Sequence, residues 1–552
     1  MKVVIVGGVA GGATTAARLR RINEDAEIVV FERSGFVSYA NCGLPYYIGG
    51  VITDEEELTL QSPESFKERF NVDVFVAHEV TKINVEKKTV SVKCLVTGRE
   101  FEESYDKLVL SPGARPAQPK MLATDCDKVF TLRTVEDTKK IEKYVKATNP
   151  KTAVVAGGGF IGIEMAENLV DMGVKVTIVQ MMPQMLPVID EDMACQVHTA
   201  LRDGGIDLRL NTTALGFEED GNQVKTLIQD ADPITADMVI MAIGVTPDTA
   251  IAREAGLELG LGGSIVVNDH METSAPDIYA VGDAVQIKNF VTGADALIPL
   301  AGPANKQARI VANNINGIDS VYRGSLGSSV VKVFDITAAV TGLNEKAAKA
   351  AGIDYDRVVL SPNSHASYYP GGVPMTMKVL FEKKTLKIIG AQIVGPSGVD
   401  KRIDVLATAI MAGMTALDLR ELDLAYAPPY SSAKDPVNMA GFMIDNIGSG
   451  RVKQFHWNEL RDLPRDGSVV LLDVRTEEER EEDGYVEGFD LCVPVDELRE
   501  RIAEVPTGKP VYVMCYSGIR SYIACSILKQ NGYDCYNFSG GYRFYEIVKE
   551  LI

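Results

Sequence analysis

The sequence predicts an α/β protein with two Rossmann-like βαβ units, a following α+β segment and a smaller α/β module near its C-terminal end. Three observations indicate this fold class. Glycine-rich turns follow short apolar strands at residues 7 and 157, apolar strands alternate over 325–445, and the composition becomes more charged after Gly448-Ser449-Gly450. A chain of 552 residues has room for three or four domains of roughly 150 residues each.

The first βαβ unit starts with an apolar strand over residues 2–6, and a helix over 13–22 and a strand over 27–31 follow. The turn between strand and helix reads Gly7-Gly8-Val9-Ala10-Gly11-Gly12. Backbone N–H groups of such a turn and the helix dipole bind a pyrophosphate, while Glu32 at the end of the second strand can accept from a ribose hydroxyl. Val9 departs from the pattern, because it stands where G-x-G-x-x-G has its second glycine.

The second unit has all three glycines of the fingerprint. A strand over 152–156 leads into Gly157-Gly158-Gly159-Phe160-Ile161-Gly162, followed by a helix over 163–172 and a strand over 174–179. Gln180 closes that strand, where an NAD site usually carries Asp or Glu, and no arginine follows to hold a 2′-phosphate. We therefore expect NADH as the nucleotide, with NADPH as the alternative.

Three further strands bracket the second unit. In residues 105–114 an apolar strand ends in a small-residue turn that contains Ser111 and Gly113. Residues 236–244 repeat this pattern, with Gly244 in the turn. Residues 274–284 form a strand that ends in Gly282-Asp283. A carboxylate at the mouth of the first unit can accept hydrogen bonds from a ribityl chain.

Cys42 lies in the segment Ser38-Tyr39-Ala40-Asn41-Cys42-Gly43-Leu44-Pro45, and no second cysteine follows it nearby. A redox reaction at this thiol must therefore pair its sulfur with an external group. The candidates are a small thiol, a persulfide, or a peroxide that leaves a sulfenic acid. A buried structural cysteine is the alternative, and the position beside two nucleotide motifs favours the reactive interpretation.

The formal net charge of −20 argues against general nucleic-acid binding, which needs clustered cations. An anionic small molecule is compatible with a local basic group, and the sequence offers Arg18, Arg20, Arg21, Lys67 and Arg69; a solvated helix face is the alternative. No apolar run of about 18 residues and no signal-peptide pattern occur, so we expect a cytoplasmic protein. The eight cysteines show no zinc spacing, so we expect no metal site.

These motifs, in this order, resemble the two-dinucleotide flavoproteins known as pyridine nucleotide-disulfide oxidoreductases. The resemblance covers residues 1 to about 320 and implies that the first unit binds FAD, that the insert binds NAD(P)H, and that Asp283 holds the flavin's ribityl chain. The residues that it implies for FAD are Gly7, Gly8, Ala10, Gly11, Gly12, Glu32, Arg33, Asn41, Ser111, Gly113, Gly282, Asp283 and Pro303. Those implied for the nicotinamide nucleotide are Gly157, Gly159, Phe160, Ile161, Gly162, Glu164, Gln180 and Gly244.

The segment around Cys42 is most similar to the single-cysteine branch of this family, which contains coenzyme A disulfide reductases, NADH peroxidases and NADH oxidases. Its signature resembles that of the coenzyme A disulfide reductases and their persulfide-reducing relatives, and so does Leu300-Ala301-Gly302-Pro303-Ala304-Asn305-Lys306-Gln307. In this branch two tyrosines of the partner subunit, matched here by Tyr368 and Tyr426, donate hydrogen bonds near the active cysteine. The resemblance therefore implies a homodimer. If coenzyme A is the substrate, the basic residues above are its expected site, and we predict that Arg18, Arg21, Ser38, Asn41, Lys67 and Arg69 bind it.

The C-terminal module carries a second thiol, on a loop between a strand over 511–514 and a helix. The loop reads Cys515-Tyr516-Ser517-Gly518-Ile519-Arg520, where we expect backbone N–H groups to stabilise a thiolate or a persulfide anion and Arg520 to add a cation. With 473–475 and 539–542, this loop resembles a rhodanese domain, although Tyr485 replaces a customary histidine. A phosphatase loop is the weaker interpretation, because the spacing from cysteine to arginine is one residue short.

These observations predict a reductase of coenzyme A persulfide or polysulfide that uses NAD(P)H, FAD and Cys42, with Cys515 carrying sulfane sulfur. The alternatives are a coenzyme A disulfide reductase that maintains thiol pools, an NADH peroxidase or oxidase, and a sulfur carrier or redox sensor without turnover. The expected domains are 1–110 with 275–322 for FAD, 111–274 for NAD(P)H, 323–446 for dimerisation, a linker over 447–453, and 454–552 for the rhodanese fold.

Overall fold

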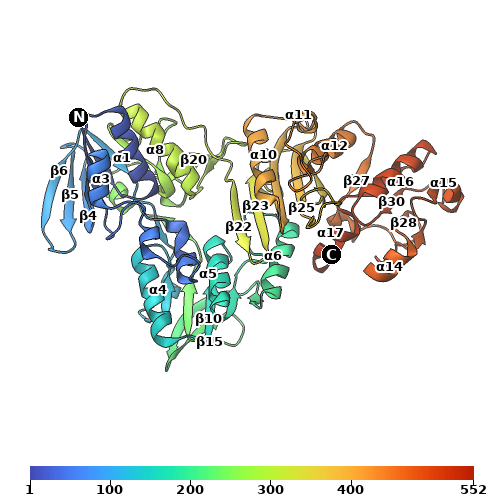
Figure 1. Cartoon of the computed structure of the whole chain (residues 1–552), viewed down its shortest axis with the longest axis horizontal. Helices are drawn as coiled ribbons and strands as arrows, with labels where there is room; N and C mark the ends of the chain where they lie inside the picture. Colours follow the sequence, from blue (N-terminus) through green and yellow to red (C-terminus); the bar gives the residue numbers. More distant parts are fainter. The chain divides into compact units, whose positions relative to one another are not determined.

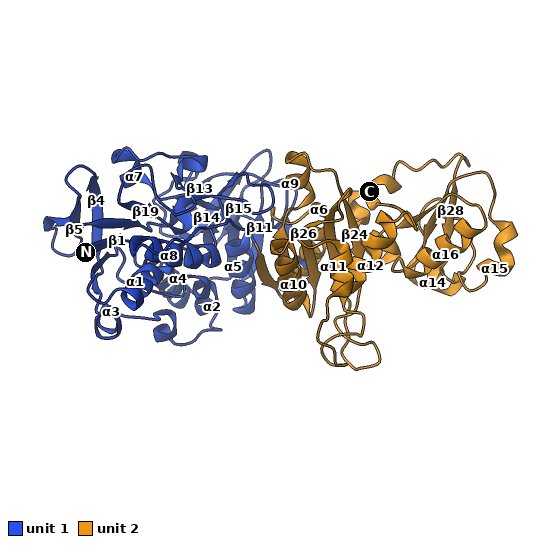
Figure 2. Ribbon diagram, turned by 90° about the horizontal axis from the view of Figure 1, so that it is seen from above, with its two compact units in different colours: residues 1–186, 201–327 blue, residues 187–200, 328–552 orange.

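The computed structural model describes residues 1–552 (Figure 1) and divides into two compact units, which Figure 2 distinguishes by colour. Unit 1 comprises 1–186 and 201–327, and unit 2 comprises 187–200 and 328–552. The structure confirms a mixed α/β fold. None of its helices has both the length and the apolar character that a membrane span requires.

A five-stranded parallel sheet organises the first βαβ region, in the strand order β19-β7-β1-β2-β3. Its strands are β1 (Lys2–Val6), β2 (Glu27–Phe31), β3 (Asp73–Phe75), β7 (Lys107–Leu110) and β19 (Ile278–Ala280). The helices of this region are α1 (Ala10–Ile22), α2 (Leu44–Ile48), α3 (Pro63–Phe70), α7 (Ala250–Glu254) and α8 (Ala301–Ile315). An antiparallel sheet of β4 (His78–Asn84), β5 (Thr89–Cys94) and β6 (Glu100–Ser104) shares its hydrophobic core.

A second five-stranded parallel sheet follows the order β12-β11-β10-β16-β9. Its strands are β9 (Val129–Thr131), β10 (Thr152–Ala156), β11 (Lys175–Val179), β12 (Asp207–Arg209) and β16 (Met238–Met241), with helices α4 (Val135–Thr148) and α5 (Phe160–Asp171). An antiparallel sheet adds β13 (Ala214–Asp220), β14 (Gln223–Ile228) and β15 (Ile234–Ala236). The crossing segments β8 (Ala114–Pro116) and β17 (Val245–Pro247) pair with each other, and β18 (Ile265–Val266), β20 (Val285–Lys288) and β21 (Asp295–Ala296) form a small sheet.

The two glycine turns repeat the same backbone geometry. Gly7 and Gly157 both have positive φ, and a Cβ atom on either would lie 2.1 or 2.3 Å from a carbonyl oxygen of a neighbouring strand end. A Cβ on Gly12 would lie 1.8 Å from the Gly7 carbonyl oxygen, and one on Gly162 would lie 2.2 Å from that of Gly157. Glycine is therefore required at these positions, since any larger residue would push each helix away from its strand.

The first half of unit 2 is an antiparallel sheet in the order β22-β23-β26-β25-β24. Its strands are β22 (Ser329–Val333), β23 (Ile336–Gly342), β24 (Tyr355–Leu360), β25 (Thr376–Glu382) and β26 (Ile388–Gly395). The helices are α6 (Glu191–Asp203), α9 (Glu345–Ala350), α10 (Val399–Met411), α11 (Ala416–Glu421) and α12 (Pro436–Gly448). Helix α12 extends into the predicted linker, and β27 begins at Lys453, so only four residues separate them.

The second half of unit 2 has a parallel sheet in the order β27-β31-β30-β28-β29. The strands are β27 (Lys453–Phe455), β28 (Val470–Asp473), β29 (Leu491–Cys492), β30 (Val511–Met514) and β31 (Cys535–Phe538). The helices are α13 (Trp457–Leu460), α14 (Glu477–Asp483), α15 (Leu498–Arg501), α16 (Ile519–Gln530) and α17 (Gly541–Val548). Buried hydrogen bonds join both halves of the unit, among them Val359 N to Ser539 Oγ at 3.1 Å.

A buried charge network also joins the two halves of unit 2. Lys378 is fully buried and pairs with Asp192 at 2.8 Å, with Asp190 at 3.0 Å and with Glu345. The indole of Trp457 donates to Asp192 at 3.0 Å. Desolvation lowers the pKa of Lys378, but the negative charges of the three carboxylates outweigh it, so the pKa is raised and the ammonium stays charged.

We expect Lys378→Met to destabilise unit 2 by about 3–5 kcal/mol, because it leaves buried carboxylates without their cation. Lys383→Met is the matched control: Lys383 forms an exposed ion pair with Asp354 at 3.1 Å, and its loss should cost at most about 1 kcal/mol. Urea unfolding followed by the fluorescence of Trp457, the single tryptophan, measures both variants. Equal unfolding midpoints for the two variants would show that the network contributes nothing beyond a surface ion pair.

Candidate active sites

Cys42 lies at the start of a short helical segment in unit 1. It is the middle residue of a 3₁₀ turn over Asn41–Gly43, which continues directly into α2, where Pro45 occupies the first turn. The preceding chain is fixed by Ser38, whose φ of 50° is left-handed and whose N–H donates to the Gly8 carbonyl at 2.8 Å. The thiol is solvent-exposed and forms no disulfide.

A cavity of about 320 Å³ brings Cys42 together with the first glycine turn. It collects most of the residues predicted for FAD, namely Gly7, Ala10, Gly11, Glu32, Arg33, Asn41, Ser111, Gly113, Gly282 and Asp283. The other three lie outside the lining: Gly8 donates its N–H to Glu32 at 2.8 Å, Gly12 packs on the Gly7 carbonyl, and Pro303 is buried in the first turn of α8.

The residues around this cavity fit a dinucleotide. Helix α1 begins without a side-chain cap and without an acidic residue in its first turn, so its N-terminal N–H groups keep their capacity to bind an anion. A Cβ atom at Gly11 would lie 2.7 Å from Ser111 Oγ, so this position has no room for a side chain. The backbone of the turn is therefore uncovered on this side. Glu32 stands at the end of β2, where the carboxylate that binds ribose is expected.

Arg133 is a site residue that the sequence did not reveal. It lines the same cavity, and its guanidinium donates to Asp283 Oδ2 at 2.9 Å. With its amide group turned, Asn41 would also donate to the Arg133 carbonyl at 2.7 Å and accept from its guanidinium at 3.0 Å. Arg133 stands alone between β9 and α4, outside any motif, so only the folded chain shows its connection to Asp283 and Cys42.

The charges around Cys42 favour its protonated form. Desolvation raises the pKa of the thiol above its ordinary value of 9.0, and the carboxylates of Glu164 and Asp283 raise it further, while Arg133 lowers it. Glu164 comes from α5, accepts from Tyr46 at 3.3 Å, and has a pKa that desolvation raises to about 7. Glu164 therefore changes its charge near neutral pH, within electrostatic reach of the cysteine.

The second glycine turn lies at the start of α5. Gly159 caps the helix without a side-chain bond, a Cβ there would meet no atom within 4 Å, and Phe160, Ile161 and Gly162 form the first turn. Gly244, with a φ of 113°, follows the Ala242-Ile243 backbone that packs on Gly157. Gln180 is buried and donates from its amide to the Gln184 carbonyl at 3.1 Å, so no charged group ends this strand.

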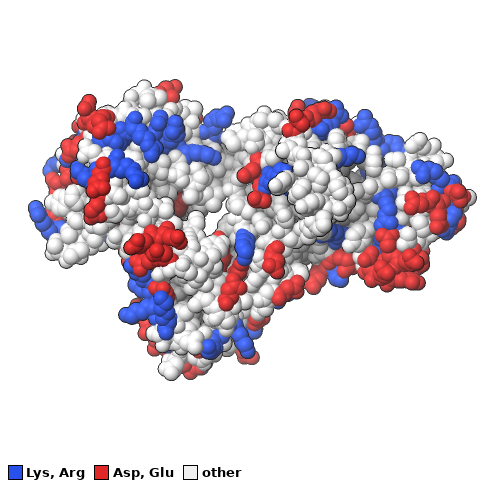
Figure 3. Space-filling model, in the orientation of Figure 1, with Lys and Arg blue, Asp and Glu red and all other residues white.

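The basic residues predicted for coenzyme A do not form one free cluster. Figure 3 shows Lys and Arg side chains over the part of unit 1 where α1 and α8 lie. Arg18 donates to Asn313 at 3.1 and 3.2 Å, Arg21 stacks over the Phe70 ring, and Lys67 pairs with Asp73 at 2.7 Å. Arg69 is exposed on α3.

Arg20 does not belong to this surface, contrary to the sequence-based expectation. It is 6 % exposed, and its guanidinium donates to the backbone carbonyls of Phe70, Asn71 and Ala26. Its charge therefore holds the loops after α1 and α3 and is unavailable to an anionic ligand.

In unit 2, Tyr368 and Tyr426 share a hydrogen bond between their hydroxyls at 2.5 Å. Both side chains are nonetheless exposed, at 72 % and 46 %, and Tyr430, four residues after Tyr426, is 71 % exposed. Large aromatic residues grouped on a surface are typical of a protein interface. The structure thus brings together the two tyrosines that the resemblance assigns to a partner's active site.

Cys515 is fully buried in the loop between β30 and α16. Its sulfur accepts from Gly518 N at 3.1 Å and from Ser521 Oγ at 3.2 Å, as expected for a loop that stabilises a thiolate or a persulfide. The segment 539–542 lies against the backbone of Cys515, because Tyr542 N donates to the Cys515 carbonyl at 2.8 Å. A Cβ on Gly541 would lie 2.7 Å from that same carbonyl, so this contact requires glycine.

Arg520 is not a free cation beside Cys515. Its guanidinium forms a bidentate pair with Glu479 of α14, at 2.6 Å to both oxygens, and this pairing lowers the pKa of Glu479 to about 2. Helix α14 is acidic along its length, and Figure 3 shows the red patch over it. The loop around Cys515 therefore gains little positive charge from Arg520.

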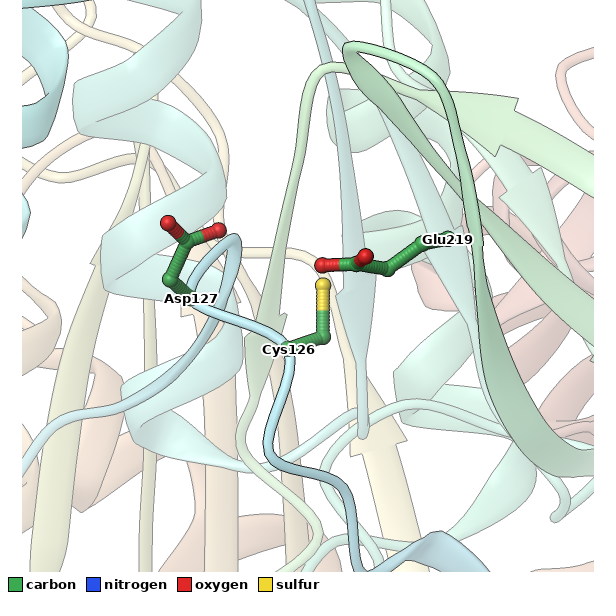
Figure 4. A group of neighbouring side chains, drawn as sticks. All are labelled: Cys126, Asp127 and Glu219. Atoms are coloured by element: carbon green, nitrogen blue, oxygen red, sulfur yellow. The ribbon is translucent and has the colours of Figure 1, made fainter.

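Each of two groups of potential metal ligands contains a lysine that pairs with its carboxylates. Cys126, Asp127 and Glu219 have ligand atoms within 4.8 Å of one another (Figure 4), but Lys128 lies 3.3 Å from Asp127 and 3.4 Å from Glu219. Asp190, Asp192 and Glu345 form the second group, and Lys378 occupies it. In each group the lysine ammonium offsets part of the negative charge of the carboxylates.

We expect Glu164→Gln to speed the alkylation of Cys42 by iodoacetamide at a fixed pH below the thiol's pKa, because it removes a negative charge that raises this pKa. Arg133→Met should slow the same reaction, since Arg133 lowers the pKa. Mass spectrometry of the Cys42 peptide across the titration range measures both. Glu142→Gln is the control, because Glu142 pairs with Lys146 at 2.5 Å and does not act on Cys42. Unchanged rates in both test variants would refute this electrostatic description.

Three domain families match successive parts of the chain. Residues 1–297 match the family described as pyridine nucleotide-disulphide oxidoreductase, 328–436 match its dimerisation domain, and 456–546 match the rhodanese-like domain. A coenzyme A disulfide reductase of Staphylococcus aureus is 39 % identical over 442 residues, which cover 80 % of this chain and 99 % of the relative.

Two solved structures span nearly the whole chain. Reduced CoADR-RHD of Bacillus anthracis has a TM-score of 0.96 at 47 % identity and covers 100 % of this chain and 98 % of that one. An NAD-dependent persulfide reductase from A. fulgidus has a TM-score of 0.92 at 39 % identity and covers 99 % and 100 %. The chain therefore belongs to the pyridine nucleotide-disulfide oxidoreductases, and it carries their dimerisation domain followed by a rhodanese domain.

Proposed function

We propose that this enzyme reduces coenzyme A persulfide or polysulfide with NADH and FAD, that Cys42 is the reacting thiol, and that Cys515 carries sulfane sulfur. The observation that carries the proposal is the pairing of two different sulfur sites in one chain. One is an exposed lone thiol at the dinucleotide cavity, and the other is a buried thiol held by two hydrogen-bond donors.

The residues of the first cavity would hold FAD as their types suggest. The glycine turn and the α1 N-terminus would bind its pyrophosphate, Glu32 its ribose and Asp283 its ribityl chain. When bound, FAD would supply the route by which two electrons from NADH reach sulfur at Cys42. Gln180 offers neither a carboxylate for a ribose 2′-hydroxyl nor a cation for a 2′-phosphate, and we assign NADH because no arginine follows it.

At Cys42 the chemistry requires a thiolate. The thiolate would attack the inner sulfur of coenzyme A persulfide, so that a Cys42–coenzyme A disulfide forms while the bond between the two persulfide sulfurs breaks and hydrosulfide leaves. Two electrons and a proton then return the thiolate of Cys42 and release the coenzyme A thiol. Overall, one persulfide, one NADH and one proton give one thiol, one hydrogen sulfide and NAD⁺.

The raised pKa of Cys42 makes its activation necessary. Arg133 is the positive charge that stabilises the thiolate, and Glu164 opposes it when ionised. Because the pKa of Glu164 is about 7, a protonated Glu164 favours the thiolate and is also able to give a proton to a departing sulfur. The hydroxyls of Tyr368 and Tyr426 from the second subunit of a homodimer would donate to the same leaving sulfur.

Coenzyme A disulfide reduction is the second candidate, because the same thiol can attack a disulfide, and a relative of that name is 39 % identical. Coenzyme A disulfide reduction gives Cys515 no role in the reaction, although the hydrogen-bond donors around its sulfur suit a persulfide. A peroxidase or oxidase would likewise leave Cys515 unused, and a sulfur carrier without turnover would hold a flavin that NADH does not reduce.

We expect anaerobic NADH oxidation to be faster with coenzyme A persulfide than with coenzyme A disulfide, and one sulfide to appear per NADH. Cys42→Ser should lower the rate with either substrate by about 10³-fold or more, because it removes the nucleophile. Cys515→Ser is the control, since free coenzyme A persulfide reaches Cys42 without it. Faster turnover with the disulfide would instead assign the enzyme to thiol-pool maintenance.

A further inference from the structure

Two loops of unit 2 present the tyrosine pair, Tyr368 and Tyr426. Tyr368 lies in the loop between β24 and β25, and Tyr426 lies in the loop between α11 and α12. Within unit 2 both side chains are exposed, so packing holds them only weakly, yet their hydroxyls bond to each other across 58 residues of sequence. That bond forms only while the backbones of the two loops keep a fixed separation.

A single arginine joins the bases of these two loops. Arg402 lies on α10 and is only 1 % exposed. Its guanidinium donates to the Ser364 carbonyl at 2.9 Å, four residues before Tyr368. It also donates to the Tyr430 carbonyl at 3.4 Å, four residues after Tyr426. One buried side chain therefore bonds to both loops at once.

A buried carboxylate completes this junction. Asp435 is 3 % exposed and accepts from the Arg402 guanidinium at 3.1 Å and from the Ser431 hydroxyl at 2.7 Å. The Ser431 carbonyl in turn accepts from Ala366 N at 3.0 Å, which joins the two loops directly. Because a buried ion pair is often no more stabilising than an apolar core of similar volume, its presence here favours a geometric role.

The fold makes room for this guanidinium at the start of α10. Gly398 has a φ of 77°, and a Cβ atom there would lie 2.2 Å from Arg402 Nη1, which donates to the Gly398 carbonyl at 3.2 Å. Nη1 therefore faces the start of the helix, while Nη2 faces the two loops. Arg402→Lys would keep the charge but lose this planar fork, whose two nitrogens hold the helix start and the loops in one geometry.

We propose that Arg402 is the positioning residue of the tyrosine pair. It holds the two loops at the separation at which Tyr368 and Tyr426 share a hydrogen bond and are able to donate together to one sulfur. This inference rests on the proposed function, in which these hydroxyls serve the leaving sulfur at the active site of the other subunit. It assigns the orientation of both donors to a buried residue that touches no substrate.

The first test is a double-mutant cycle on kcat/KM for NADH oxidation with coenzyme A persulfide, in the full-length enzyme. We expect Tyr368→Phe/Tyr426→Phe and Arg402→Lys each to lower kcat/KM by about tenfold, as the loss of a hydrogen bond to a charged sulfur would. All three changes together should cause no larger loss, because Arg402 acts only through hydroxyls that are then absent. A combined loss of about a hundredfold, or full activity of Arg402→Lys, would overturn the proposal.

The second test observes the tyrosine pair itself and needs no turnover. In protein labelled with 3-fluorotyrosine, Tyr426→Phe identifies the fluorine resonance of Tyr426, and Tyr368→Phe gives its position without the shared hydrogen bond. We expect Arg402→Lys to move the Tyr426 resonance from its wild-type position to that of the Tyr368→Phe variant. A resonance that stays in its wild-type position would show that the loops do not depend on Arg402.

Arg357→Lys is the matched control for both tests. The side chain of Arg357, on β24, is 12 % exposed and pairs with Glu345 at 3.0 Å. It also donates to Asn458 at 2.6 Å, and both partners lie outside the two loops. Arg357→Lys should leave kcat/KM and the Tyr426 resonance unchanged, and the melting temperatures of both lysine variants report any loss of stability. Equal shifts of the resonance in the two variants would reduce the role of Arg402 to general stability and overturn the proposal.

The two readouts separate this inference from the proposed function. If the proposed function is wrong, coenzyme A persulfide is not turned over, and the fluorine resonance still shows whether Arg402 holds the tyrosine pair. If only the inference is wrong, the wild-type enzyme turns over the persulfide while Arg402→Lys leaves the resonance in place. Turnover that the two phenylalanine substitutions do not lower would also overturn the inference, because the tyrosine pair would then have no role in the reaction.

Discussion

The absence of a cysteine partner for Cys42 is the constraint on which the chemistry of this enzyme depends. All eight cysteines are free, and the one beside the dinucleotide cavity has no second thiol within its segment. Electrons delivered there cannot be stored as an intramolecular disulfide. Under the proposed function the substrate brings the second sulfur, and the protein would hold that sulfur next to the Cys42 thiol.

The thiols of Cys42 and Cys515 lie in environments that differ in exposure and in hydrogen bonding. Cys42 is exposed, and its pKa is raised by desolvation and by Glu164, so its thiolate is disfavoured, while Arg133 and a protonated Glu164 favour it. Cys515 is buried and accepts two hydrogen bonds, an arrangement that excludes water and, under the proposed function, would hold a terminal sulfur in place. The first environment suits turnover, and the second suits storage.

Local patterns predicted the parts of the fold that depend on neighbouring residues. Both glycine turns, the strands that flank them and the cysteine loop follow from short-range rules, because a tight turn leaves no room for a Cβ at Gly12 or Gly162. The cavity also contains most of the residues that the resemblance assigned to FAD.

Contacts between distant segments could not be predicted in this way. Arg133 reaches Asp283 across 150 residues, and Lys378 reaches Asp192 across 186. Arg520 was expected to act on Cys515 because it is near in sequence, yet its partner is Glu479, which is 41 residues away. Arg20 was grouped with its neighbours on α1, but the helix turns it toward the carbonyls that it binds. Charge pairing is decided by the folded chain, and spacing in the sequence does not reveal it.

The most direct test of the central claim is the mass of Cys42 in the enzyme treated with coenzyme A persulfide without NADH and then digested under acid. We predict that the Cys42 peptide carries coenzyme A through a disulfide bond and that NADH removes it. An unmodified Cys42, a disulfide to another cysteine of the chain, or a sulfenic acid formed only with peroxide would contradict it.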